Sequence, residues 1–360
     1  MQPTKPKLKI VIRPSWSKHD QRELPDWFKQ SQTGIIIHWG IYSVPAFHIL
    51  PKTAKKKGLC NGSEWYWKRL RTPFLYKTDT RDYHHNTYGS DFDYTQFAQQ
   101  FNPTNFDPNK WAKLFKEAGA TYVVFTAKHH DGFCMWPTNV PTQYNNGYWD
   151  VCKIGPQRDI LGELATAVRQ QGIKFGIYYS LYEWYNPLYN SDKRLNKKEG
   201  KIVSRNYVQQ VVNPHLQELL NYEPEIIFFD GDWEQPPEYW RSIDILNMLY
   251  TSRAKDTIIV NDRLGDGTAG KHGDYFNIKD RFIPTDNQIP NKKWETVMTI
   301  GNSWGYNQME QPSDFKSVAQ VKELQSEIYR KGGNLLLNVG PDQYGNIRPE
   351  EQQILLNLAK

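Results

Sequence analysis

Short, β-rich apolar runs recur along the chain with helical segments between them, and this alternation constrains the fold more than any other feature. The runs cover residues 33–38, 122–127, 174–180, 225–229, 257–261, 296–300 and 334–339. Amphipathic patterns cover 108–118, 159–171, 206–222 and 317–331, and a last helix covers 350–359. Apolar strands that alternate with helices are typical of a parallel sheet covered on both faces. These runs approach the strand number of a closed barrel, so the sequence predicts an α/β fold of the (β/α)8 (TIM) barrel class.

The domain organisation follows from the chain length. Barrels of this class occupy about 250 residues or more, and 360 residues suit one such domain with an extended N-terminal segment. The last amphipathic helix finishes at the chain end, so we predict a single domain over residues 1–360. The stretch from about 48 to 92 follows the first strand, is basic and irregular, and is predicted to be a long loop.

The charge of the chain does not indicate a nucleic-acid partner. The formal net charge is +6 and the isoelectric point is about 8.9. The basic residues are scattered, however, and the tightest run is KTAKKK at 52–57. Because electrostatic binding of nucleic acid needs a contiguous basic face, we interpret this run as part of a solvated loop and expect no nucleic-acid binding.

Cysteine usage and the N-terminal segment bear on the compartment. Cys60, Cys134 and Cys152 lack a CxxC spacing, so neither a disulfide framework nor a zinc knuckle is indicated. The first residues, MQPTKPKLKIVIRPSW, contain no apolar stretch long enough for a secretory signal or a membrane span. We therefore expect either a cytoplasmic protein or a mature chain whose signal has been removed.

Polar and aromatic side chains follow most of the predicted strands. In a parallel barrel the carboxyl ends of the strands and the loops after them build the active site. A single polar strand end has ordinary structural explanations, but several rich in His, Asp, Arg, Trp and Tyr favour one pocket. These ends are His38-Trp39, Lys128-His129-His130-Asp131, Tyr179-Ser180, Asp230-Gly231-Asp232, Asn261-Asp262-Arg263 and Asn338.

Two chemistries fit such a pocket, and the residue types alone leave both open. The histidines together with Asp230 could hold a hydrolytic zinc ion, although the first strand carries one histidine and not an HxH pair. Glycoside hydrolysis instead needs a carboxylate at a strand end and a second from another loop. Aromatic residues make up 14% of the chain, with 13 Trp and 22 Tyr, and such flat apolar faces suit a sugar ring.

Nine blocks of the sequence match one known enzyme family. They are WFKQSQTGIIIHWGIYSVPAF (27–47), EWYW (64–67), FTAKHHDGFCMWPT (125–138), WDVCKIGPQRDIL (149–161), GIYYSLYEWYNP (176–187), IIFFDGDWEQPPEYW (226–240), IIVNDR (258–263), KWETVMTIGNSWGY (293–306) and GGNLLLNVGPDQYGNI (332–347). In these blocks, which are in the family's order and run from about residue 20 to the end of the chain, the sequence resembles the α-L-fucosidases of glycoside hydrolase family 29, in particular the animal-type members.

The resemblance implies a (β/α)8-like catalytic barrel that releases α-linked L-fucose with retention, through a covalent glycosyl-enzyme. The family's nucleophile is the aspartate that closes the fourth strand, which matches Asp230. Asp232 and Glu234 follow a glycine turn and are interpreted as loop residues. For the acid/base, Asp280 in YFNIKDRFIP is favoured, and Glu295 in KWETVMTI is the alternative.

The same resemblance implies the contacts to the sugar. The imidazoles of His38, His129 and His130 correspond to groups that hydrogen-bond its hydroxyls, Glu64 and Trp65 to an acidic and aromatic wall, and Tyr179 and Arg263 complete the ring. Trp65, Phe228 and Trp304 offer apolar faces for the C5 methyl group. No metal or organic cofactor is implied, and the expected partner is a fucosylated glycan or glycoconjugate.

Two further expectations concern the context of the chain. Family members usually continue into a C-terminal β-sandwich domain, which we expect to be absent here, and apolar surface left exposed would then favour a homo-oligomer. The family's animal enzymes are lysosomal or secreted, and one glycosylation sequon, Asn61-Gly62-Ser63, is present. The competing hypotheses are a fucose-binding protein on the same fold with impaired catalysis, and a metal-dependent hydrolase.

Overall fold

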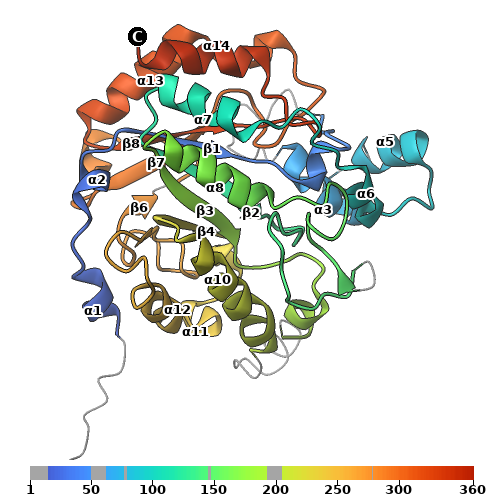
Figure 1. Cartoon of the computed structure of the whole chain (residues 1–360), viewed down its shortest axis with the longest axis horizontal. Coiled ribbons are helices and arrows are strands. Elements are labelled where there is room, and N and C mark those ends of the chain that lie inside the picture. The colour runs from blue at the N-terminus through green and yellow to red at the C-terminus, as the bar shows by residue number, and fades with distance from the viewer. Residues whose placement is uncertain (1–14, 50–61, 77–78, 145–146, 193–204, 278) are drawn as a thin grey trace, which may run out of the picture.

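The computed structural model describes residues 15–49, 62–76, 79–144, 147–192, 205–277 and 279–360 (Figure 1). Eight parallel strands form one sheet in the order β5-β4-β3-β2-β1-β8-β7-β6. An isolated parallel bridge between Asn261 and Tyr275 joins the two edges, so the sheet closes into a barrel. The (β/α)8-like fold is therefore confirmed. The strands are β1 Thr33–Ile37, β2 Tyr122–Lys128, β3 Lys174–Ser180, β4 Ile226–Asp230, β5 Ile259–Val260, β6 Phe276–Asn277, β7 Trp294–Thr299 and β8 Asn334–Val339.

Side chains along the strands divide between two apolar layers, because successive residues of a strand point to opposite faces. One layer fills the barrel interior and includes Ile36, Tyr178 and Phe228. The other lies between the sheet and the helices, and takes their neighbours Ile37 and Tyr179. A shift of one residue along a strand therefore decides whether a side chain can reach the inside of the barrel.

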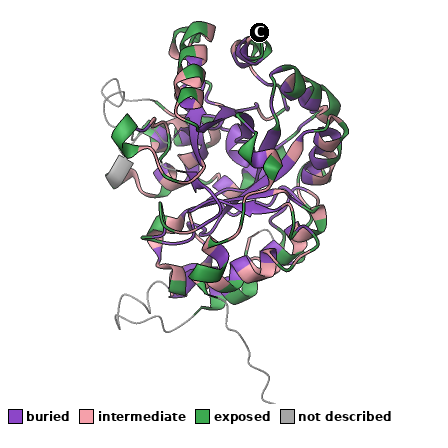
Figure 2. Cartoon of the chain, turned by 90° about the vertical axis from the view of Figure 1, so that its left-hand side faces the viewer, coloured by how far each residue is buried: buried purple, intermediate pink, exposed green. Residues whose placement is uncertain are grey.

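Helices surround the sheet and bury the faces that point toward it (Figures 1 and 2). Asp107 and Ser317 cap the first turns of α7 and α13 with their side chains, which explains why these helices begin where they do. The predicted helices are confirmed to within one or two residues at most ends. They are α7 Pro108–Glu117, α8 Ile160–Gln170, the π-helix Val208–Val212 continuing into α10 Asn213–Leu219, α13 Val318–Arg330 and α14 Pro349–Leu358.

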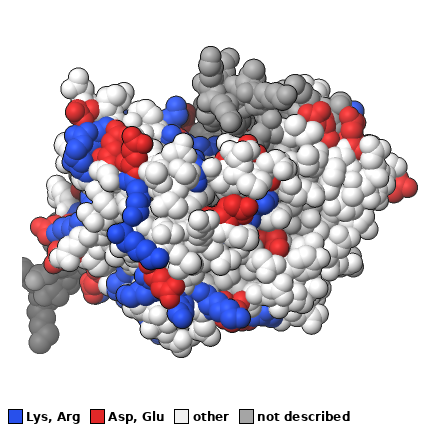
Figure 3. Space-filling view, turned by 90° about the horizontal axis from the view of Figure 1, so that it is seen from above, with Lys and Arg blue, Asp and Glu red and all other residues white. Residues whose placement is uncertain are grey.

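Shorter helical elements lie outside these predictions. They include α1 Trp16–Asp20, α2 Asp26–Lys29, η1 Ile41–Ser43, η4 Tyr94–Gln96, α6 Phe97–Gln100, η8 Asp232–Glu234, α11 Pro237–Trp240, α12 Ser242–Leu249, η9 Asp286–Gln288 and η10 Pro312–Asp314, whereas η7 Leu220–Tyr222 ends the predicted helix at 206–222. In the parts of the chain that the structure describes, no helix is long and apolar enough to cross a bilayer. Lys and Arg are interspersed with Asp and Glu on the face seen from above (Figure 3).

The predicted loop at about 48–92 is wrong for its larger part. Its residues form η3 Ser63–Trp65, α3 Tyr66–Arg71, α4 Pro73–Tyr76 and α5 Asp79–Tyr88. Aromatic packing orders this segment: Trp67 is fully buried and stacks on Tyr94 with ring centroids 4.7 Å apart. Helices this short show too few turns for an apolar period to be recognised. The basic run at 52–57, Cys60 and the sequon residue Asn61 lie outside the described residues.

The sequence did not predict strand β6. The N-terminal segment supports the seam, which is the junction of β5 and β6 where the barrel closes. Residues 261–275 connect β5 to β6 and contain no α-helix. Arg22 reaches across this seam and donates two hydrogen bonds to the Asp274 carboxylate, of 3.0 and 3.1 Å. Asp274 also accepts from Tyr250 Oη (2.7 Å) and from the N–H of Val260 (2.8 Å). One buried carboxylate thus ties the N-terminal segment, α12 and β5 together at the seam.

This arrangement predicts a stability effect. Replacing Arg22 by Met leaves the carboxylate of Asp274, whose side chain is 1% exposed, without its cation. Since removal of one partner of a buried pair leaves an uncompensated charge, we expect Arg22→Met to lower the free energy of unfolding by about 3 kcal/mol or more. Urea denaturation measures this difference.

The matched control is Lys29→Met. Lys29 pairs with Asp26 at 3.4 Å, and the two side chains are 47% and 84% exposed. An exposed pair of this kind contributes at most about 1 kcal/mol. Equal losses in the two variants would contradict the role given to Arg22.

Candidate active site

A pocket of about 420 Å³ opens at the carboxyl ends of the barrel strands. The sequence-predicted residues found in its lining are His38, Trp65, His129, His130, Phe228, Asp230, Arg263, Asp280 and Trp304. Ile36, Tyr178, Trp233 and Val297 also line it and were not predicted. Glu64, Tyr179 and Glu295 are not in the lining. The pocket therefore brings together side chains that follow β1, β2, β4, β5, β6 and β7.

Asp230 is the last residue of β4 and lies at the base of the pocket. Its Oδ1 accepts a hydrogen bond of 2.6 Å from Arg263, and its Oδ2 accepts one of 2.6 Å from the hydroxyl of Tyr178. Nε2 of His130 lies 3.6 Å from Oδ2. Burial acts to raise the pKa of Asp230, but Arg263, His130 and Tyr178 together outweigh it and lower that pKa below its usual 3.8. The carboxylate is therefore ionised at neutral pH.

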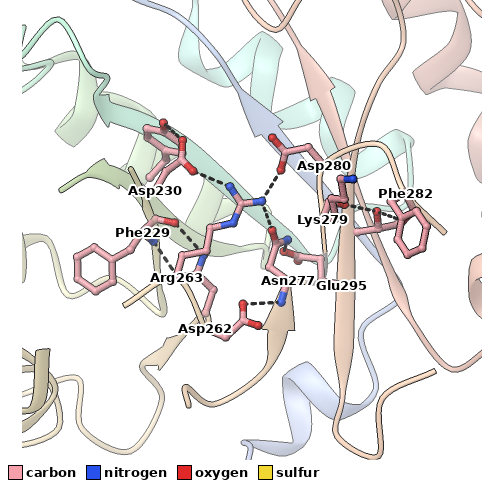
Figure 4. A network of polar contacts seen from close by, with 12 residues as sticks. Phe229, Asp230, Asp262, Arg263, Asn277, Lys279, Asp280, Phe282 and Glu295 are labelled. Carbon is pink, nitrogen blue, oxygen red and sulfur yellow. Dashed lines mark hydrogen bonds and ion pairs between the residues drawn. The ribbon is translucent and has the colours of Figure 1, made fainter. Parts of the chain in front are cut away.

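One guanidinium joins two carboxylates in the pocket. Arg263 follows β5, and its second terminal nitrogen donates to Asn277 Oδ1 (2.5 Å) and pairs with Asp280 (Figure 4). The Arg263 side chain is 12% exposed. Its pKa is raised because, against the effect of burial, the negative charges of Asp280 and Asp230 favour the cation. Arg263 thus stays charged between the two acids.

The two acid/base candidates lie in different environments. The Asp280 side chain is 45% exposed and lines the pocket. Glu295 belongs to β7, is fully buried, and accepts hydrogen bonds from Tyr122 Oη (2.5 Å) and Asn277 Nδ2 (3.3 Å). Burial raises the pKa of Glu295 to about 7. Glu295 therefore lies behind the pocket wall and contacts Asn277, the residue that holds Arg263.

The imidazoles of the pocket are neutral hydrogen-bond acceptors. Nδ1 of His38 lies 2.6 Å from Oδ1 of Asn338, whose amide nitrogen donates to the carbonyl of Trp304. Nδ1 of His130 lies 2.7 Å from Oγ of Ser180, which itself donates to the carbonyl of Tyr182. Both imidazoles must therefore donate from Nδ1, which leaves the lone pair of Nε2 free for a ligand.

Burial also keeps these imidazoles uncharged. It lowers the pKa of His38 from 6.5, and with the neighbouring charges it lowers the pKa of His129 well below 6.5. It also lowers the pKa of His130 to about 4. Nδ1 of His129 is buried and has no hydrogen-bond partner among the described residues. Neutral imidazoles of this kind can accept hydrogen bonds from the hydroxyl groups of a sugar.

Two predicted pocket residues are placed elsewhere, which corrects the prediction. Tyr179 points out of the barrel, and its hydroxyl lies 3.0 Å from Nδ1 of His215. Its neighbour Tyr178 takes the inward position, because successive strand residues alternate between faces. Glu64 is fully buried and accepts from the N–H groups of Gly62 (2.6 Å) and Gly305 (3.0 Å), so it ties two loops together behind the wall.

The loop after β4 contains the remaining carboxylates of the DGDWE run. Glu234 accepts a hydrogen bond of 2.8 Å from Tyr189, and neither Asp232 nor Glu234 lines the pocket. Trp233, 47% exposed, is the residue of this loop that does. The spacing of residues in the sequence could not predict that Trp233 lines the pocket, because a turn sets the direction of its side chain. Within the described ranges, no group of three or more His, Cys, Asp or Glu side chains is placed to hold a metal ion.

A closed parallel barrel with two carboxylates in the pocket at its strand ends carries the pair of acids that glycoside hydrolases use. The sequence model of the α-L-fucosidase family matches residues 2–360, and the chain belongs to this family, glycoside hydrolase family 29. It is 40% identical to the tissue α-L-fucosidase of Homo sapiens over 355 residues, which cover 96% of this chain and 69% of the human protein. It is 39% identical to the α-L-fucosidase of Dictyostelium discoideum over 338 residues, 93% of this chain and 68% of that protein.

Solved structures give the same result. The α-fucosidase of Thermotoga maritima in complex with fucose is similar with a TM-score of 0.75 and 35% identity, covering 96% of this chain and 75% of that one. A family 29 α-L-fucosidase of Bacteroides thetaiotaomicron, trapped as a covalent intermediate with 2-fluoro-fucosyl fluoride, has a TM-score of 0.72 and 28% identity, covering 92% and 72% of the two chains. The resemblance found in the sequence is thereby confirmed.

The pocket predicts the titration of His130. Its pKa is lowered from 6.5 to about 4, mainly by burial. The unfolded chain takes up a proton near 6.5, whereas the folded protein does not until about pH 4, so stability falls as the pH drops through this window. NMR of protein with ¹³C- and ¹⁵N-labelled histidine should show His130 as a neutral Nδ1–H tautomer from pH 8 down to about pH 5. The matched comparison is the urea-unfolded chain, and a folded-state midpoint at or above pH 6 would contradict the assignment.

Proposed function

We propose that the protein is a retaining exo-α-L-fucosidase that hydrolyses terminal α-L-fucose from glycans or glycoconjugates. The observation that carries this proposal is the ionised Asp230 at the base of the pocket, joined through Arg263 to a second carboxylate, Asp280. Retention needs carboxyl groups about 5–5.5 Å apart, and here one guanidinium pairs with both carboxylates. Family membership and the trapped covalent intermediate of the Bacteroides relative support the same reaction.

The reaction proceeds in two displacements. In the first, a carboxylate oxygen of Asp230 forms a bond to the anomeric carbon while the bond to the leaving oxygen breaks, and Asp280 gives its proton to that oxygen. In the second, Asp280 takes a proton from water, the water oxygen attacks the anomeric carbon, and the ester to Asp230 breaks. Fucose leaves with its original configuration, and both carboxyl groups return to their starting states. No step of this mechanism calls for a metal ion or an organic cofactor.

Asp280 suits the acid/base role better than Glu295 does. Asp280 lines the pocket and is 45% exposed, so it can exchange its proton with solvent and meet the leaving group at the pocket mouth. Glu295 is fully buried and bonded to Tyr122 and Asn277. We infer that Glu295 orients Asn277, which in turn holds Arg263.

Recognition of fucose relies on neutral acceptors and apolar faces. The free Nε2 atoms of His38 and His130 accept from ring hydroxyls, and a sugar lacking such a hydroxyl would leave a buried polar atom unpaired. Phe228 and Trp304 provide apolar surface for the C5 methyl group, which contributes only about 1–3 kcal/mol of discrimination. The hydroxyl contacts therefore set most of the selectivity.

We extend the proposal to the cellular context of the enzyme. Its similarity to animal tissue α-L-fucosidases supports a lysosomal or secreted location. The substrate is a fucosylated glycan or glycoconjugate. We also propose that residues 1–360 act as one catalytic domain. Because both carboxylates line the pocket, an impaired fucose-binding protein is the less favoured function.

The nucleophile assignment predicts that Asp230→Ala lowers kcat/KM for an aryl α-L-fucoside by at least about a thousand-fold, because no covalent intermediate can form. Added azide should restore turnover and give the β-configured fucosyl azide, which chromatography and NMR identify. The control Asp232→Asn changes a carboxylate of the same loop outside the pocket and should stay within about tenfold of the wild-type rate. EDTA should leave the wild-type rate unchanged, and a fully active Asp230→Ala enzyme would remove the mechanism.

The acid/base assignment predicts a dependence on the leaving group. Since general acid catalysis contributes about 10²–10⁴-fold, Asp280→Asn should lower kcat/KM by that factor for a fucosyl disaccharide. With 2,4-dinitrophenyl α-L-fucoside, which leaves without protonation, the loss should be small. Glu295→Gln, the matched variant, should lower both rates by a similar factor. The reverse pattern would assign the acid/base role to Glu295.

A further inference from the structure

We propose that Arg281 is a positioning residue that directs Asp280 toward the leaving-group oxygen. It also fixes the position of Trp304, which lines the pocket, relative to Asp280. This inference rests on the proposed role of Asp280 as acid/base. Arg281 itself does not line the pocket. It acts through its neighbour in the chain and through the aromatic ring on which its guanidinium lies.

The backbone of Arg281 is the first observation. Its φ is +56°, in the left-handed region that side chains other than glycine rarely adopt. Such a conformation is unfavourable for a residue with a side chain and persists only where surrounding contacts impose it. The N–H of Arg281 donates to the carbonyl of Val297 on β7 at 2.9 Å. The chain therefore reverses at Arg281 against a strand of the barrel, immediately after the catalytic carboxylate.

The side chain of Arg281 supplies the contacts that offset this strain. Its Nε donates to Oγ1 of Thr299, the last residue of β7, at 3.1 Å. One terminal nitrogen donates to the carbonyl of Asn302 at 2.9 Å, and the guanidinium carbon lies 4.5 Å from the centroid of the Trp304 ring. A glycine would adopt this φ without strain but would make none of these contacts. They connect the Asp280 loop with the loop that places Trp304.

Asp280 needs such external support. Its side chain is 45% exposed, so packing does little to fix its direction, and its carboxylate pairs with Arg263. The loop around it is fastened from β7: Thr296 donates to the carbonyl of Phe282 at 2.6 Å (Figure 4). Together with the Arg281 contacts, this fixes the chain on the C-terminal side of Asp280. Proton transfer requires the carboxyl group to lie within hydrogen-bond reach of the leaving-group oxygen. The rate of this step falls steeply when the carboxyl group is misplaced by about 1 Å.

The test is the leaving-group dependence of Arg281→Gly. Glycine adopts this backbone conformation without strain and removes the side-chain contacts, so misfolding through strain is avoided. We expect kcat/KM for a fucosyl disaccharide to fall by about 10–100-fold, a part of the full general-acid effect. For 2,4-dinitrophenyl α-L-fucoside the change should stay within about threefold, because that reaction needs no proton. A role in stability alone would lower both rates equally.

The matched control is Arg241→Gly, which removes another arginine with a φ of +56° at a position outside the pocket. It should change neither rate. Arg281→Lys, which keeps the charge and the aliphatic stem but loses the planar fork, is the second variant. It should show a smaller loss with the same dependence on the leaving group. Thermal unfolding of each variant confirms that the measured protein is folded.

Asp280→Asn is measured beside these variants to separate the two proposals. If Asp280→Asn shows the leaving-group dependence and both Arg281 variants do not, the positioning role of Arg281 is wrong and the proposed function stands. If Asp280→Asn itself shows no such dependence, the acid/base assignment fails, and the inference about Arg281 fails with it.

Discussion

The charge arrangement of the site depends on one buried guanidinium, that of Arg263. A buried carboxylate without a cation is unstable, and the side chain of Asp230 is only 12% exposed. Arg263 supplies that cation and pairs with Asp280 through its other terminal nitrogen. In the proposed reaction, Asp230 loses its charge when it forms the ester. Arg263 is then left with Asp280 as its counter-ion at the stage where Asp280 must act as a base.

The barrel places Arg263 by an unusual means, because the strands on either side of it are only two residues long. Beyond the ends of these strands, side chains make the hydrogen bonds that the backbone makes between paired strands. The amide of Asn261 accepts from the N–H of Phe229 at 3.0 Å and donates to its carbonyl at 2.9 Å, as a further strand residue would (Figure 4). Asp262 likewise accepts from the N–H of Asn277 at 2.9 Å. Polar side chains thus join β4, β5 and β6 at the level of the proposed catalytic carboxylates.

These features explain how much could be predicted from the sequence. In long strands and amphipathic helices the apolar residues recur at a regular spacing, so the positions of these elements and the barrel class could be predicted from the sequence. The two-residue β6 has no period, and the helices at 63–88 are set by aromatic contacts with distant residues. Residues that end strands, such as Asp230 and Arg263, could be placed in the pocket by the rule for parallel barrels. Tyr178 was missed in favour of Tyr179 because a run in which both faces are buried does not show which residues point inward.

The contrast between the two carboxylates follows from what each must do in the proposed reaction. There the nucleophile meets a single atom, the anomeric carbon of a sugar fixed by the pocket, so Asp230 can be buried and held by Arg263 and Tyr178. The acid/base meets leaving groups that differ from substrate to substrate, and it must exchange its proton with water between the two steps. An exposed loop gives Asp280 that access but leaves its direction weakly defined. The strained backbone and guanidinium contacts of Arg281 meet this need, since they restrain the loop from the barrel side and leave the carboxyl group open to solvent.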